Sequence, residues 1–153
     1  YRDTSDRKWG HAYLNREFFH CLHASMPERV VLVLAEAEGA WVGGALNLLG
    51  ADTLYGRYWG CAEPYKYLHF EACYYRAIDF AIERGLKWVE AGAQGPHKIQ
   101  RGYLPRETYS AHWIADPAFE RAVARFLDDE RESVRYEMGA RGRHSPFRDD
   151  DAG

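Results

Sequence analysis

The sequence contains few cysteines and no long apolar run. Its three cysteines, Cys21, Cys61 and Cys73, lie far apart and form no CxxC pair. An odd number of separated cysteines fits a reducing compartment better than a disulfide scaffold. No apolar run reaches the length of a membrane span, and the chain does not open with a signal-peptide pattern. We therefore expect a cytoplasmic protein.

The excess of charge is also small. A formal net charge of -3 and a sequence pI near 6.2 argue against a surface that binds nucleic acid or membrane as a whole. They are compatible with one local basic cleft. The 153 residues are 46% apolar and 15% aromatic, which is enough for one packed core. We expect a single domain over 1–138 and a poorly ordered tail over 139–153. Because the chain begins at Tyr1, we also expect it to be the later part of a longer protein.

Hydrophobic periodicity predicts the secondary structure. Apolar residues recur with helical spacing over 13–25, 67–84 and 119–134. Continuous or alternating apolar runs over 30–35, 41–48, 53–59, 87–91 and 108–114 predict strands. Gly85 is expected to end the second helix in the left-handed conformation. Asp116 and Pro117 are expected to cap and begin the last helix.

The order of these elements predicts an α/β (α+β) fold with a mixed, mostly antiparallel sheet. The first three strands are predicted to form an antiparallel meander. The helix over 67–84 would then carry the chain to a strand that is parallel to 53–59 and lies beside it. That arrangement would place Trp59 and Glu90 at neighbouring strand ends. The crevice at the carboxyl end of such a pair is the expected place for a ligand.

A glycine-rich segment follows Glu90. Gly92, Gly95 and Gly102 would let backbone N–H groups approach an anion, and Lys98 and Arg101 supply positive charge. The segment matches neither the dinucleotide-binding fingerprint nor the P-loop. It therefore predicts either an anion-binding site or an ordinary connection that carries two surface cations.

From Arg57 onward the residues resemble a known family. The bacterial FemAB-like proteins, a group of GNAT-type acyltransferases labelled with peptidoglycan biosynthesis, share a set of short motifs with this chain. The matching residues are Arg57-Tyr-Trp-Gly60, Glu63-Pro-Tyr65, His69-Phe-Glu71, Glu90-x-Gly92-Ala-Gln94-Gly95, His97-Lys98 and Arg101-Gly-Tyr103. The resemblance covers about 29–127, and it implies a GNAT-like fold and the C-terminal part of a protein whose N-terminal half is missing.

The resemblance also implies a site near substrate phosphates. Gly92, Lys98 and Gly102 fall in places comparable to the glycine, lysine and second glycine that close this site in Fem transferases, while His97 stands where those enzymes have phenylalanine. A second segment, Arg57-x-x-Gly60-x-Ala62, fits the pyrophosphate loop of acetyl-CoA enzymes. In those enzymes the loop runs directly into a helix, whereas here Glu63-Pro64-Tyr65 intervenes.

Transfer of an acyl group to an amine requires a base, hydrogen-bond donors for the oxyanion and residues that bind the acyl donor. Glu90, with its pKa raised by burial, or His97 could be the base. Glu90 could instead organise the loop by accepting N–H groups of residues 92–94 or by pairing with Arg101. The backbone around Gly92, Gln94 and Gly95 could hold the oxyanion. Lys98 and Arg101 could bind phosphates of a tRNA acceptor end, a lipid-linked precursor or coenzyme A.

Other candidates carry two interpretations each. Glu71 is either catalytic or half of a buried ion pair with an arginine such as Arg57 or Arg76. The aromatic residues Trp59, Tyr65 and Tyr67 either line an acyl pocket or belong to the core. We expect no metal site, because His20 and His23 have no third ligand nearby in the sequence. We also expect no permanently bound cofactor.

Three hypotheses about function remain. We expect an acyltransferase that moves an aminoacyl or acetyl group to a small-molecule or lipid-linked amine, with aminoacyl-tRNA or acyl-CoA as the donor. A half-domain that binds ligands without catalysis is the alternative, and convergence of Glu90, His97 and Lys98 would separate the two. A stand-alone acetyl-CoA enzyme is the third, and it would require residues 60–62 to form a phosphate nest at a helix N-terminus.

Overall fold

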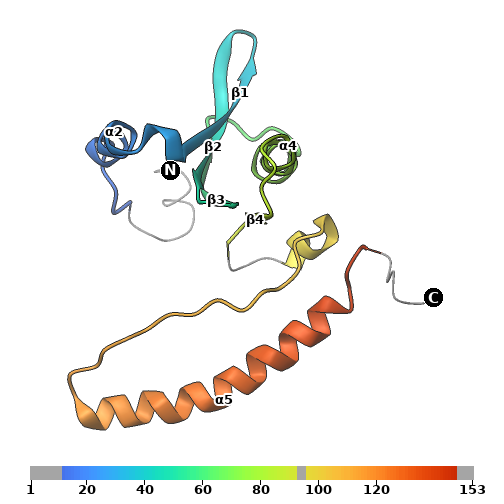
Figure 1. The fold of residues 1–153 in the computed structure, drawn as a ribbon. Helices are drawn as coiled ribbons and strands as arrows, with labels where there is room; N and C mark the ends of the chain where they lie inside the picture. Colours follow the sequence, from blue (N-terminus) through green and yellow to red (C-terminus); the bar gives the residue numbers. More distant parts are fainter. Residues whose placement is uncertain (1–11, 93–95, 148–153) are drawn as a thin grey trace. The chain divides into compact units, whose positions relative to one another are not determined.

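A computed structural model describes residues 12–92 and 96–147 of the chain (Figure 1). The chain divides into two compact units, Tyr1–Gln94 and Gly95–Gly153. The first unit contains a sheet with flanking helices, and the second contains a short helical turn and a long helix. Each unit is described by itself below.

The first unit is built on a four-stranded sheet in the order β1-β2-β3-β4. The strands are β1 (Val30–Ala37), β2 (Ala40–Leu49), β3 (Thr53–Cys61) and β4 (Trp88–Glu90). β1, β2 and β3 pair antiparallel, whereas β3 and β4 pair parallel. The predicted meander, the parallel pair and the mixed α/β class are therefore confirmed, and the arrangement is consistent with a GNAT-like α+β fold.

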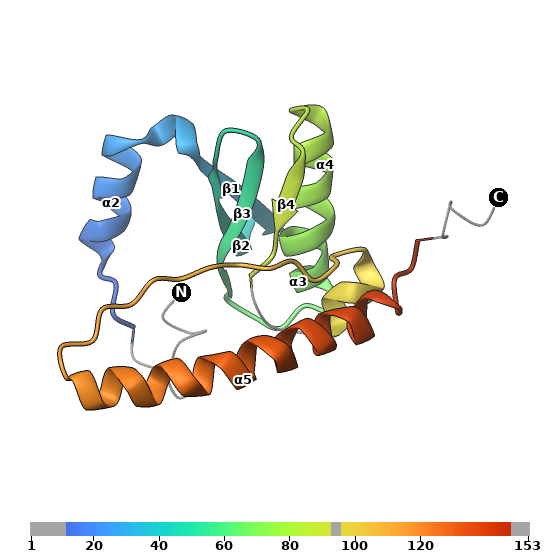
Figure 2. The same ribbon diagram turned by 60° about the horizontal axis from the view of Figure 1, so that its bottom comes forward.

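Helices cover both faces of this sheet. Figures 1 and 2 show α2 (Arg16–Ser25) on one side of the strands and α4 (Arg76–Glu83) on the other. The connection from β3 to β4 begins with α3 (Leu68–Phe70) and a π-helical turn, η2 (Glu71–Tyr75), which continues into α4. Gly85, at φ +63°, follows α4 as predicted. A further short 3-10 turn, η1 (Pro27–Arg29), precedes β1.

The core lies between the sheet and the helical connection. Leu54 on β3 has no exposed surface, and Ala45 on β2 is 3% exposed. The helical side supplies small residues, Ala72, Ala77 and Ala81, together with the ring of Tyr74. Small side chains let the helix backbone approach the strands closely. Burial in this region raises the pKa of the Cys73 thiol to about 12, so this cysteine stays protonated at neutral pH and serves packing.

The second unit contains a 3-10 turn, η3 (Pro96–Arg101), and α5 (Pro117–Gly142). Asp116 caps α5, since its carboxylate accepts hydrogen bonds from the backbone N–H groups of Ala118 and Phe119 at 2.8 Å each. The prediction of a strand over 108–114 is wrong, because this segment pairs with no strand among the described residues. Alternation favours an extended backbone, but a strand also needs a partner for its N–H and C=O groups. α5 continues past Met138 to Gly142, into the segment expected to be a tail.

Candidate functional site

The parallel strands β3 and β4 run together for only three residue pairs. Thr53, Leu54 and Tyr55 pair with Trp88, Val89 and Glu90, and β4 then ends while β3 continues to Cys61. Trp59 lies four residues beyond Tyr55, or roughly 13 Å further along the strand. The prediction that Trp59 and Glu90 mark neighbouring strand ends is therefore wrong, because the carboxyl end of β4 lies beside Tyr55, near the start of β3.

A β-bulge in β3 accompanies this parting of the strands. Leu46 pairs with Tyr58 and Asn47 pairs with Gly56, which leaves Arg57 as the extra residue. An extra residue bends its strand and increases the local twist. Just before the bulge, a Cβ atom on Gly56 would lie 3.3 Å from the carbonyl oxygen of Glu90. The missing side chain of Gly56 thus allows the end of β4 to approach β3 where the two strands part.

Glu90 presents its side chain to solvent at this point. The residue is exposed, so the burial expected from the sequence is absent. Within the described residues of the first unit, no hydrogen bond or ion pair involves its carboxylate. Two residues later Gly92 adopts φ +78°, a conformation that favours glycine. We call the region formed by Tyr55, Gly56, Glu90 and Gly92 the strand-end site.

The remaining residues of the glycine-rich segment fall outside this unit. Gln94 and Gly95 lie outside the described residues. His97, Lys98 and Arg101 lie on η3 in the second unit, where Arg101 Nη1 donates a 2.7 Å hydrogen bond to the His97 carbonyl. Glu90 thus belongs to the first unit, whereas His97 and Lys98, with which it was to converge in an acyltransferase, belong to the second.

Gly102 ends η3 for a structural reason. Its φ is +84°, and a Cβ atom there would lie 2.7 Å from Cζ of Phe147. Both the backbone conformation and the aromatic ring beside it favour glycine at this position. The backbone conformation and the neighbouring ring explain why glycine occupies position 102 without a bound phosphate. The predicted role of Gly102 in anion binding stays a prediction.

Three further candidate site residues lie on β3. Arg57, at the bulge, places its guanidinium 5.0 Å from the centroid of the Tyr58 ring and lines a cavity of about 270 Å³ against α2. Trp59 packs edge-to-face against His69, with ring centroids 5.5 Å apart. Gly60 pairs with Gly44 inside the sheet, and the Ala62 N–H donates to the Val42 carbonyl at 2.8 Å. Residues 60–62 therefore prolong β3 toward the connection and do not form the phosphate nest that an acetyl-CoA enzyme would need.

Glu71 forms the ion pair that the sequence left open. Arg76 is the partner, and its Nε and Nη2 atoms both donate to Glu71 Oε1, at 2.8 and 2.7 Å. This hydrogen bond and the charge of Glu71 raise the pKa of the Arg76 guanidinium further above its usual range. Arg76 also contacts Asp79 at 3.1 Å. The prediction of Arg76 as the partner of Glu71 is confirmed, but the pair is half-exposed and not buried as predicted.

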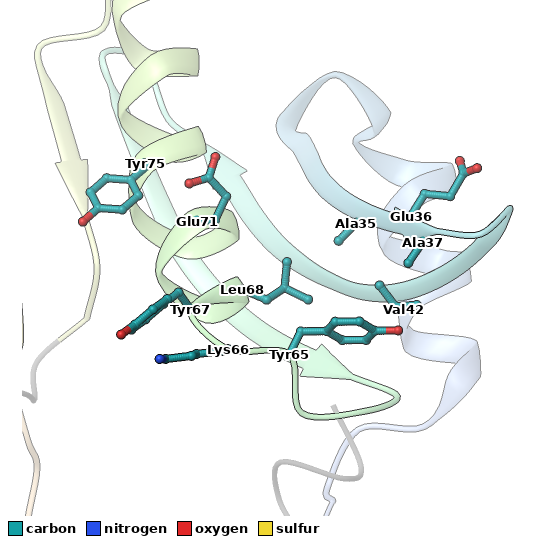
Figure 3. A pocket seen from close by; sticks show the side chains of 10 residues that line it. All are labelled: Ala35, Glu36, Ala37, Val42, Tyr65, Lys66, Tyr67, Leu68, Glu71 and Tyr75. Atoms are coloured by element: carbon teal, nitrogen blue, oxygen red, sulfur yellow. The ribbon is translucent and has the colours of Figure 1, made fainter.

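The structure also contains a cavity that the sequence did not reveal. It measures about 350 Å³ and lies between the β1–β2 hairpin and the π-helical turn (Figure 3). We call it the π-turn pocket, and its lining residues are Ala35, Glu36, Ala37, Val42, Tyr65, Lys66, Tyr67, Leu68, Glu71 and Tyr75. Among the three aromatic candidates, Tyr65 and Tyr67 line this pocket, whereas Trp59 packs beneath α3.

Two irregularities of the backbone shape this pocket. Tyr67, which precedes α3, has φ +66°, a conformation that is uncommon for residues other than glycine. Five residues from Glu71 to Tyr75 form a π-helical turn, and such turns occur frequently at functional sites. The sequence carries no signal for either feature, because the apolar spacing of 67–84 fits a regular α-helix.

Neither a membrane-spanning helix nor a metal-binding cluster occurs among the described residues. No helix in 12–92 or 96–147 combines the length and the apolar character needed to cross a membrane. Over the same ranges, no three histidine, cysteine, aspartate or glutamate side chains gather where they could hold a metal ion.

One family model matches the chain. A comparison with curated proteins and with solved structures found no match. The family model FemAB-like, described as peptidoglycan biosynthesis/recognition, matches residues 1–149. This match spans nearly the whole chain and includes both units and every candidate residue named above. The chain therefore belongs to the FemAB-like family of peptidoglycan biosynthesis and recognition.

Proposed function

We propose that the chain takes part in N-acyl transfer to an amine during peptidoglycan precursor synthesis. The amine nitrogen attacks the acyl carbonyl carbon, a C–N bond forms, and the bond from that carbon to the leaving oxygen or sulfur breaks. The nitrogen loses a proton to a base, and the leaving group takes up a proton. No covalent enzyme intermediate is required for this step.

One observation carries the proposal beyond family membership. The parallel strands part after Tyr55 and Glu90, and an exposed carboxylate stands at the point of parting. Crevices at the carboxyl ends of strands in α/β sheets are common ligand sites. Because Glu90 is exposed, its carboxylate is accessible to an amine, which supports a role as proton acceptor.

The donor belongs to one of two chemical classes. An aminoacyl ester of tRNA and an acyl thioester of coenzyme A both present phosphates, which Lys98 and Arg101 would bind by charge-assisted hydrogen bonds. We favour the aminoacyl ester, since residues 60–62 continue the sheet pairing instead of forming a phosphate nest. The acceptor would be a small or lipid-linked amine of the cell-wall precursor pathway.

A thermal-shift comparison tests which donor the chain binds. A ligand present at about 100 times its Kd stabilises the native state by about 2.7 kcal/mol, which raises Tm by several degrees in a domain of this size. We expect aminoacyl-tRNA to raise Tm. Acetyl-CoA and free coenzyme A, added at the same concentration as the aminoacyl-tRNA, should raise Tm less. A nucleotide-linked muropeptide with a free amine should raise Tm as the acceptor.

The matched control is deacylated tRNA of the same sequence. Equal shifts with charged and deacylated tRNA would show recognition of the nucleic acid alone. The absence of any shift with the donors and with the muropeptide would contradict the proposed function.

A further inference from the structure

We propose that the π-turn pocket is a binding site for an organic cation, namely a primary ammonium at the end of a short aliphatic chain. Glu71 would accept hydrogen bonds from the ammonium, and the apolar floor of the pocket would hold the chain. This site is separate from the strand-end site and is not needed for the acyl transfer proposed above.

The first support is the arrangement of the Glu71 carboxylate. Both hydrogen bonds from Arg76 go to Oε1. Within the described part of the chain, no hydrogen bond reaches Oε2, and Glu71 lines the pocket. Arg76 therefore fixes the side chain through one oxygen and leaves the other able to accept hydrogen bonds from a ligand.

The π-helical turn produces this arrangement. In a regular α-helix, residues five apart point about 140° away from each other around the helix axis. The wider π turn from Glu71 to Tyr75 places residue 76 close enough to hold residue 71. Arg76 shares its charge between Glu71 and Asp79, so the group of three keeps one net negative charge. A cation is the complementary ligand.

The walls of the pocket suit an alkyl chain that carries this cation. Ala35, Ala37, Val42 and Leu68 supply aliphatic surface, and the Tyr65 ring lies on the same side of the helical segment as Val42 (Figure 3). The rings of Tyr67 and Tyr75 also line the pocket, on the other side of that segment. Lys66 also lines the pocket, and its Nζ lies 4.9 Å from the centroid of the Tyr67 ring, so this ring contacts an ammonium in the structure. Tyr65 and Tyr75 offer further rings, and they are 43% and 45% exposed.

Volume and position define the ligand further. About 350 Å³ is near the lower end for small-molecule pockets, so it accommodates a group the size of a side chain and not a whole nucleotide carrier. The pocket takes no residue from β4. Its β2 residue Val42 lies beside Gly43, which pairs with Cys61 at the far end of β3 from Tyr55. A ligand in the pocket thus does not depend on Glu90.

The test is a titration of the whole chain with three probes of equal length: n-hexylammonium, n-hexanol and n-hexanoate. Binding is followed by two-dimensional NMR through the backbone amide signals of Ala35 and Leu68. We expect hexylammonium to bind about ten-fold more tightly than hexanoate, because Glu71 attracts the first and repels the second. Equal or tighter binding of hexanoate would overturn the proposal, and so would shifts confined to signals outside the pocket.

Two matched variants locate the cation. Glu71→Gln should weaken hexylammonium about five-fold, as expected for a half-exposed ion pair, and leave hexanol unchanged. Glu36→Gln also removes a lining carboxylate, but this one points away from the other lining side chains in Figure 3, so the affinity should change less than about two-fold. Equal effects of the two substitutions would contradict a specific role for Glu71.

A third variant tests the pocket independently, in case Glu71→Gln misfolds. Ala35→Leu adds volume to the floor of the pocket and retains every charge, so it should weaken all three probes together. Unchanged affinity in this variant would place the probes elsewhere. The outcome is independent of the proposed function, since hexylammonium binding is measured without a donor, and a chain that transfers no acyl group would still show it.

Discussion

Replacing Leu54 with alanine is expected to lower the free energy of unfolding by about 2 to 5 kcal/mol, the range for large-to-small substitutions in protein cores. Leu54 is fully buried, pairs with Leu49 and Val89 and lies on the strand that joins the antiparallel meander to β4. The loss combines the transfer free energy of the deleted methyl groups with the cost of the cavity that remains. Urea unfolding followed by far-ultraviolet circular dichroism measures this change.

Leu32→Ala provides the matched control. Leu32 lies on β1 and is 57% exposed, so the same substitution should cost less than about 1 kcal/mol. Comparable losses for the two variants would show that the sheet does not bury Leu54 as described.

Replacing Glu90 with glutamine is expected to lower the turnover of acyl transfer by roughly 10²- to 10⁴-fold, which is the usual contribution of a positioned general base. Glu90 is exposed, and substitutions at exposed positions usually change stability little, so the substitution should leave Tm unchanged. Initial rates with saturating donor and acceptor, together with a melting curve, measure both quantities.

Glu83→Gln is the control for Glu90→Gln. Glu83 is also exposed, at the end of α4, and it lies outside the strand-end site. Its substitution should leave turnover unchanged. A loss of both stability and donor affinity in Glu90→Gln would instead assign Glu90 to the support of its loop, and full turnover would exclude it as the base.

Local patterns in the sequence predicted most of the first unit. Continuous apolar residues identified β1, and helical spacing identified the connection that contains α4. Gly85 and Asp116 marked a helix end and a helix start correctly. These features depend on neighbours within a few residues, so one sequence contains enough information to predict them.

Features that depend on pairing between distant residues were harder to predict. The parallel pair of β3 and β4 followed from topology, but its register did not, because β4 is short and β3 carries a bulge at Arg57. The strand predicted over 108–114 needed a partner that alternation alone cannot supply. Strand pairing is a property of the folded unit, and a single strand's pattern leaves it open.

The π-turn pocket was the least visible feature. Only Glu71 among its charged residues was a candidate from the sequence, and the choice between Arg57 and Arg76 as its partner stayed open until the π-helical turn was known. The lining residues come from two separate stretches of the chain, 35–42 in the β1–β2 hairpin and 65–75 around α3 and the π-helical turn. A cavity made by such segments has no local signature in a sequence.

The most direct measurement of the proposed function is the detection of the amide product by mass spectrometry. The chain is incubated with a nucleotide-linked muropeptide that bears a free amine and with either aminoacyl-tRNA or acetyl-CoA. We predict a product whose mass increases by one acyl residue and whose new bond resists hydroxylamine, as an amide does and an ester or thioester does not. Donor binding without such a product, in the same reaction, would contradict acyl transfer and would identify the chain as a ligand-binding domain.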